Sequence, residues 1–119
     1  MRRWLMALAM AAGAQAAQVT WTGWFADEQC ATARAESGQF GPTNPECAKT
    51  CIQDGKAAAF ISEQAKAVFK VEGYSGVIAD LGYHVQITAD VDNGKQTVAI
   101  RSVKRLGYEN LSCERPRKK

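Results

Sequence analysis

The chain has 119 residues, of which 46% are hydrophobic, 23% are charged and only 3 are proline. This composition is typical of one globular domain and excludes a disordered, collagen-like or low-complexity chain. The formal charge of +3 falls to +1 when Arg2 and Arg3 are assigned to a cleaved segment, because 13 basic residues then stand against 12 acidic ones. So small a net charge argues against a nucleic-acid partner.

The N-terminus has the features of a secretory signal peptide. A positive start at residues 1–3 is followed by an apolar run over 4–12 and by a small-x-small cleavage motif at 14–16. We therefore expect residues 1–16 to be removed and the mature chain to be periplasmic or secreted. The apolar run is shorter than the roughly 20 residues that span a bilayer, and no second one follows. The mature chain is thus expected to have no transmembrane segment.

The first predicted strand covers residues 19–25, where polar and apolar residues alternate. This alternation places Trp24 on the face opposite Trp21. Residues 26–44 show no sustained period and are predicted to form a long loop.

A helix is predicted to follow this loop. Asn44 suits its N-cap and Gly55 its end. It carries Cys47 and Cys51 one turn apart, and β-carbons at that spacing lie about 5–6 Å apart. A disulfide needs about 3.5–4.5 Å, so the two are not expected to pair with each other.

All four cysteines fall in the mature part of the chain, and an even number in a small exported protein predicts two disulfides. Cys47 and Cys51 are each expected to reach Cys30 or Cys113, and both pairings remain open. The alternative is a thiol-based carrier of a soft metal such as Cu(I), or a redox protein, using Cys47 and Cys51.

Four more strands and a short helix are predicted further along. Residues 57–62 and 68–72 read as a hairpin, and residues 74–81 as a short helix with Ser75 as its N-cap.

The runs 84–92 and 95–103 flank Asn93-Gly94, a strong signal for a two-residue type I′ turn. That turn pairs Asp92 with Lys95 and so places Ile87 opposite Ile100.

This order of elements predicts a mainly β protein with short helices. Apart from the cysteine-bearing helix inserted between strands one and two, it is the order of a small five-stranded OB-fold-like barrel. One domain is expected over 17–106, with a loop and helix insertion at 26–56. A basic tail over 107–119 is expected to be tied to it by Cys113.

The chain also resembles a group of small exported bacterial proteins of unknown function. The resemblance rests on residues 21–30 (WTGWFADEQC), 47–51 (CAKTC) and 82–88 (GYHVQIT). It covers nearly the whole mature chain and implies the OB-like barrel, but it implies no activity and no functional residues.

No catalytic constellation is evident. Ser75 lies in an incomplete nucleophile-elbow motif, and His84 is a single histidine on the outer face of its strand. We expect a non-enzymatic envelope module without a cofactor. Its partner is unspecified, an envelope protein or a glycan being the candidates, and Trp24, His84 and Arg101 are the candidate contacts.

Overall fold

The computed structural model describes residues 17–108; the expected signal peptide, most of the expected tail and Cys113 lie outside them. The elements are β1 (Ala17–Asp27), α1 (Glu28–Glu36), α2 (Pro45–Gln53), β2 (Ala58–Ser62), β3 (Ala67–Glu72), α3 (Val77–Asp80), β4 (Tyr83–Asp92) and β5 (Thr97–Tyr108).

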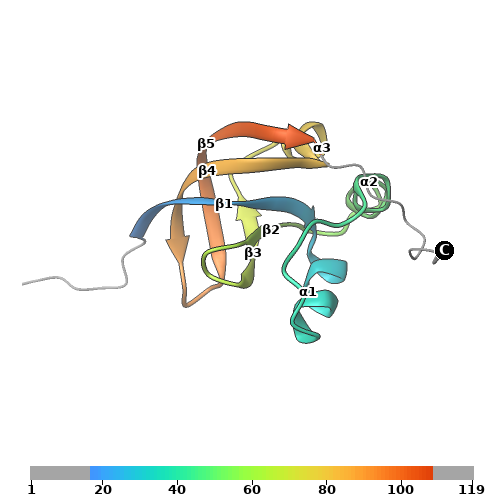
Figure 1. The fold of residues 1–119 in the computed structure, drawn as a ribbon, viewed down its shortest axis with the longest axis horizontal. Coiled ribbons are helices and arrows are strands. Elements are labelled where there is room, and N and C mark those ends of the chain that lie inside the picture. The colour runs from blue at the N-terminus through green and yellow to red at the C-terminus, as the bar shows by residue number, and fades with distance from the viewer. Residues whose placement is uncertain (1–16, 109–119) are drawn as a thin grey trace, which may run out of the picture.

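The five strands form one sheet that closes on itself in the order β1-β2-β3-β5-β4. Strand β1 pairs with both β2 and β4, and the only parallel contact in this sheet joins β3 to β5. The curved strands enclose the core, and α2 and α3 lie at the same end of the barrel (Figure 1). The expectation of a mainly β protein with five strands and short helices is confirmed.

Gly23 is the point at which β1 changes partners. It is opposite Ser62 of β2 in one register and opposite Val85 of β4 in the other. A β-carbon built on Gly23 would lie 1.8 Å from the backbone oxygen of Ile61. Only glycine permits this approach, so closure of the barrel depends on this position.

The main core fills the barrel with apolar side chains from every strand. Phe25 stacks on Tyr74 and meets the edge of Phe60, and Trp21 packs on Phe69. Ala48 of α2 and two residues at α3 complete the end of the barrel that the helices cover. The buried members are Phe25, Ala48, Phe60, Phe69, Val77, Leu81, Val85, Ile87, Ala89, Val91 and Val98.

The short helix α3 is attached through Asp80, which is buried. Tyr74 donates a hydrogen bond to one carboxylate oxygen of Asp80, and Arg105 of β5 donates to the other at 2.8 Å. Burial and the hydrogen bond to Asp80 raise the pKa of Tyr74 to about 12. The N-cap of α3 is Gly76 and no side chain caps it, so the predicted capping role of Ser75 is wrong.

The β4–β5 hairpin is longer at its turn than the sequence predicts. Asp92 pairs with Thr97, so four residues form the turn, and Gln96 adopts a left-handed conformation at φ 60°. The Asp92 side chain accepts a hydrogen bond from the Lys95 amide at 3.1 Å. Near the turn the pairing is displaced by two residues, which keeps each side chain on its predicted side of the sheet, and Ala89 faces Ile100. An irregularity between Thr88 and Ala89 then adds one more residue of β5, so Ile87 faces Val103 rather than Ile100.

The structure also corrects the predicted loop over 26–44, because residues Glu28–Glu36 form α1. Asp27 caps this helix, with a carboxylate oxygen accepting a hydrogen bond from the Cys30 amide at 2.9 Å. Only Ala31 is buried. The helix therefore lacks the apolar period by which sequence analysis detects helices.

Replacing Gly23 with alanine is expected to lower the free energy of unfolding by at least about 2 kcal/mol, because the backbone of β2 has to move away. Urea unfolding followed by circular dichroism measures the change. The matched control is Gly41→Ala, whose added β-carbon would meet nothing within 4 Å. Equal midpoints for both variants would contradict this role for Gly23.

Candidate functional site

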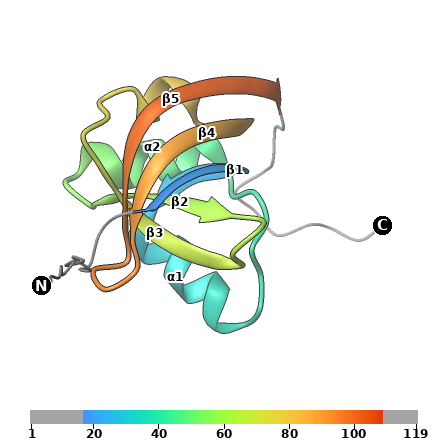
Figure 2. The same cartoon turned by 90° about the vertical axis from the view of Figure 1, so that its left-hand side faces the viewer.

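Helix α1 lies against the outer face of β2 and β3 (Figure 2). It covers a second, small apolar cluster in which Ala26, Ala31 and Ile61 are buried, with Phe40 and Val68 packed against them. Residues 28–57, which connect β1 to β2 and are called the excursion below, thus pack on a separate small core outside the barrel.

Asp27 lies where β1 ends and α1 begins. It pairs with Ala58 of β2 as the last residue of the strand, and it is only 1% exposed. Its carboxylate is held at the N-terminus of α1, where unpaired amides and the helix dipole favour a negative charge. The strand and the helix are therefore fixed to each other by one side chain.

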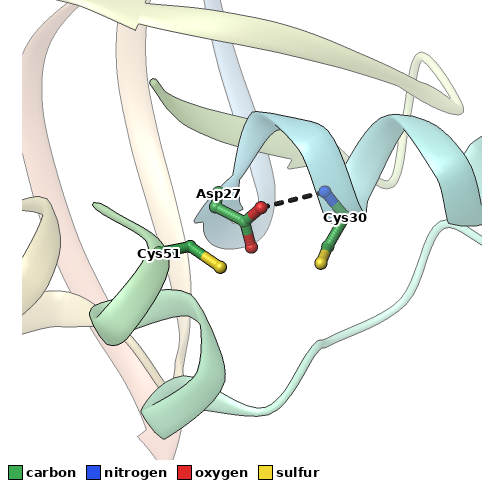
Figure 3. A group of neighbouring side chains, drawn as sticks. All are labelled: Asp27, Cys30 and Cys51. Carbon is green, nitrogen blue, oxygen red and sulfur yellow. Dashed lines mark hydrogen bonds between the residues drawn. The ribbon is translucent and has the colours of Figure 1, made fainter. Parts of the chain in front are cut away.

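Two thiols face this carboxylate. Cys30 projects from the first turn of α1 and Cys51 from the last turn of α2, and their sulfurs lie on either side of the Asp27 carboxylate (Figure 3). The two sulfurs and a carboxylate oxygen lie within 4.8 Å of one another. Residues far apart in the sequence thus form a compact group of two sulfurs and one oxygen, a set able to hold a metal ion or, through its sulfurs, to form a disulfide.

The surroundings of Cys30 disfavour its thiolate. Burial raises the pKa of the Cys30 thiol, and the negative charge and hydrogen bond of Asp27 raise it further, followed by the neighbouring Cys51. Since the thiolate is the reactive form of cysteine, Cys30 is a weak nucleophile near neutral pH. This does not suit a catalytic thiol.

Cys30 and Cys51 are free thiols in the structure and Cys113 lies outside the described residues, so the prediction of two disulfides stays a prediction. The two free thiols face each other without a bond between them. Cys47 has an interaction of its own and is not a member of the group around Asp27. The alternative metal site built on Cys47 and Cys51 is thus not the group that the structure assembles.

A groove opens on the other side of α1. It has a volume of about 470 Å³ and lies between α1, the start of β3 and the β4–β5 turn. Phe40, Ala67 and Val68 supply apolar lining. Its remaining lining residues are Glu28, Thr32, Ala35, Glu36, Lys66, Lys70, Lys95 and Gln96.

The charges of the groove are separated between its walls. Lys66, Lys70 and Lys95 come from the barrel side and are exposed, whereas Glu28 and Glu36 come from the two ends of α1. Within residues 17–108, the salt bridges join other groups and none involves these five. The three lysine ammonium groups therefore form no salt bridge with a described acidic residue, although Lys66 lies near enough to Glu63 to lower the pKa of that carboxyl group.

The predicted contact residue Trp24 does not line this groove. It is 8% exposed and stacks on His84, with ring centroids 4.8 Å apart. The His84 ring nitrogen lies 2.6 Å from Glu63, which also accepts a hydrogen bond from Thr22 at 2.7 Å. Burial raises the pKa of Glu63, but its hydrogen bonds to Thr22 and His84 outweigh this and lower it overall. These contacts join β1, β4 and the β2–β3 turn, so Trp24 and His84 have a structural role here.

Arg101, the third predicted contact, lies apart from Trp24 and His84. Its guanidinium donates to Asp90 at 2.9 Å across the β4–β5 hairpin. Ser75 is exposed beside α3. The structure therefore does not gather the weakly predicted contacts into one site.

Sequence analysis missed Asp27 as a helix cap and the three lysines of the groove. A signal for the first was present, since Asp27-Glu28 is a good start for a helix and Ser37-Gly38 a good end. No local signal marks the lysines, because they come from two turns and a strand that only the closed sheet brings together.

Comparisons with protein-family models, curated proteins and solved structures give no match for this chain. Among the described residues, no helix is both long and apolar enough to cross a membrane.

Asp27→Asn is expected to make the reduced Cys30 thiol react several times faster with iodoacetamide at pH 8. The amide still caps α1 but no longer places a negative charge beside the sulfur. Tryptic mass spectrometry at successive times measures the rate at Cys30 alone. Asp92→Asn, remote from the thiols, is the control, and an unchanged rate in Asp27→Asn would show that Asp27 does not control this thiol.

Proposed function

We propose that this protein is an exported, non-catalytic binding module of the bacterial envelope that holds an acidic, partly apolar segment of a partner protein in the groove beside α1. The observation that carries the proposal is the coincidence of an apolar lining with three exposed lysines that form no salt bridge with a described acidic residue. Export is supported by the signal-peptide features of residues 1–16.

The arrangement of the strands supports an OB-fold for this module. The closed order β1-β2-β3-β5-β4 and a helix between β3 and β4 suit that fold. OB-folds bind their ligands on the face formed by strands two and three and with the loops that follow strands one and four. The groove is lined by residues of the β1–β2 excursion, of β3 and of the β4–β5 turn. Its location therefore agrees with a binding role.

The charge pattern favours a protein segment that carries carboxylates. An extended segment has side chains alternating on two faces, so apolar side chains can contact Phe40 and Val68 while carboxylates approach Lys66, Lys70 or Lys95. A neutral glycan would gain little from three ammonium groups. Binding is therefore expected to weaken as salt is added.

The groove can be tested with a fluorescein-labelled peptide of alternating glutamate and leucine, using anisotropy at low salt. The variant Lys66→Glu/Lys70→Glu/Lys95→Glu is expected to raise the dissociation constant at least about tenfold. Three exposed charge contacts of about 0.5 kcal/mol each account for such a factor.

The matched control is Lys49→Glu/Lys56→Glu/Lys104→Glu, which changes the net charge equally at positions outside the groove lining. It is expected to bind the peptide far better than the groove variant does. Equal losses in the two variants would mean that only net charge matters and would contradict a site in the groove. Salt-independent binding of a neutral glycan, without binding of the peptide, would contradict the proposed partner.

A further inference from the structure

Helices α1 and α2 are both short, with 9 residues each. Isolated helices shorter than about 12–15 residues are marginal in water, so each depends on its contacts with the rest of the chain. Helix α2 buries Pro45 and Ala48, and Ile52 packs against the main core. Helix α1 buries only Ala31, which packs in the small cluster with Ala26 and Ile61. A covalent link between the two helices would add to these contacts.

We infer that Cys30 and Cys51 form a disulfide that fixes α1 to α2 and thereby sets the position of one wall of the groove. The effect on ligand binding rests on the proposed function, whereas the bond and its effect on α1 do not.

The geometry brings these two sulfurs into reach of a bond. They lie within 4.8 Å of each other, and a disulfide has a length of about 2.05 Å, so they need to approach by less than about 3 Å. Cys30 also borders a pocket of about 210 Å³. Cys30 is exposed, so its side chain is not locked in place by packed atoms on every side.

The same geometry decides between the pairings that the sequence leaves open. Cys47 and Cys51 are one turn apart on α2, but Cys51 is the one whose sulfur belongs to the group with Cys30 and Asp27. Cys47 has an interaction of its own. The facing pair is thus Cys30 with Cys51.

Formation of the bond is a two-electron oxidation. The two thiols lose two protons and two electrons as the sulfur–sulfur bond forms, and a disulfide of a thiol oxidant accepts both and becomes two thiols. Envelope and extracellular compartments supply oxidants of this class. The raised pKa of Cys30 indicates that its surroundings do not stabilise its thiolate, which suits a lasting structural bond rather than an oxidising catalyst.

Tryptic mapping of the full mature protein, isolated from its export compartment and alkylated without reductant, tests the bond. Cleavage after Arg34, Lys49 and Lys56 places each of the three described cysteines in its own peptide. The expected product is the Cys30 peptide linked to the peptide of residues 50–56. Alkylation of both thiols, with or without bound zinc or copper, would overturn the inference, as would linkage of Cys30 to a different cysteine.

The role of the Cys30–Cys51 disulfide in holding α1 is tested separately, by brief tryptic digestion of the folded protein. Cleavage after Arg34, near the end of α1, is expected to accelerate at least tenfold in Cys30→Ser and equally in Cys51→Ser, while circular dichroism shows an intact barrel. Unchanged cleavage would overturn the role of the bond in fixing α1.

The effect of the disulfide on binding in the groove is tested with the same glutamate–leucine peptide. Its dissociation constant is expected to be about tenfold higher for Cys51→Ser than for the wild type. Normal binding by Cys51→Ser would overturn the effect on the groove. Absence of binding by the wild type would instead contradict the proposed function, while the mapped bond and the cleavage rates would still decide the inference.

Discussion

The carboxylate of Asp27 is the contact on which the arrangement of the excursion depends. It ends β1 as the partner of Ala58, begins α1 by capping the amide of Cys30, and lies between the thiols of α1 and α2. The side chain is only 1% exposed, so its carboxylate is held between the two helices rather than in solvent. The position of α1, and with it one wall of the groove, follows from this side chain.

The barrel and the excursion have different physical support. The barrel depends on backbone pairing around Gly23 and on a continuous apolar core. The excursion depends on the Asp27 cap, on a small cluster around Ala31 and on the packing of Ala48 at the end of the barrel. This division lets the excursion present charged and apolar groups beside β3 without disturbing the barrel core. It also explains why binding is assigned to this side of the molecule.

Much of the barrel could be predicted from the sequence because its signals are local. Alternation in β1 and β4, the proline and asparagine at the start of α2, and turn residues between strands were sufficient. The four-residue turn was not predictable from Asn93-Gly94, since Gln96 adopts its left-handed conformation where its carbonyl accepts a hydrogen bond from Lys70 of a distant strand. The lysines of the groove were missed because their proximity is a property of the closed sheet.

Mapping of amide chemical shifts tests the central claim, that the face between α1, β3 and the β4–β5 turn is the binding surface. The oxidised, nitrogen-15-labelled protein would be titrated with the glutamate–leucine peptide. Saturable shifts are expected only at the amides around Thr32, Phe40, Val68 and Gln96, with those of Arg101 and Ser102 unchanged. Shifts concentrated on the outer face of β4 and β5, with the groove amides unchanged, would contradict it.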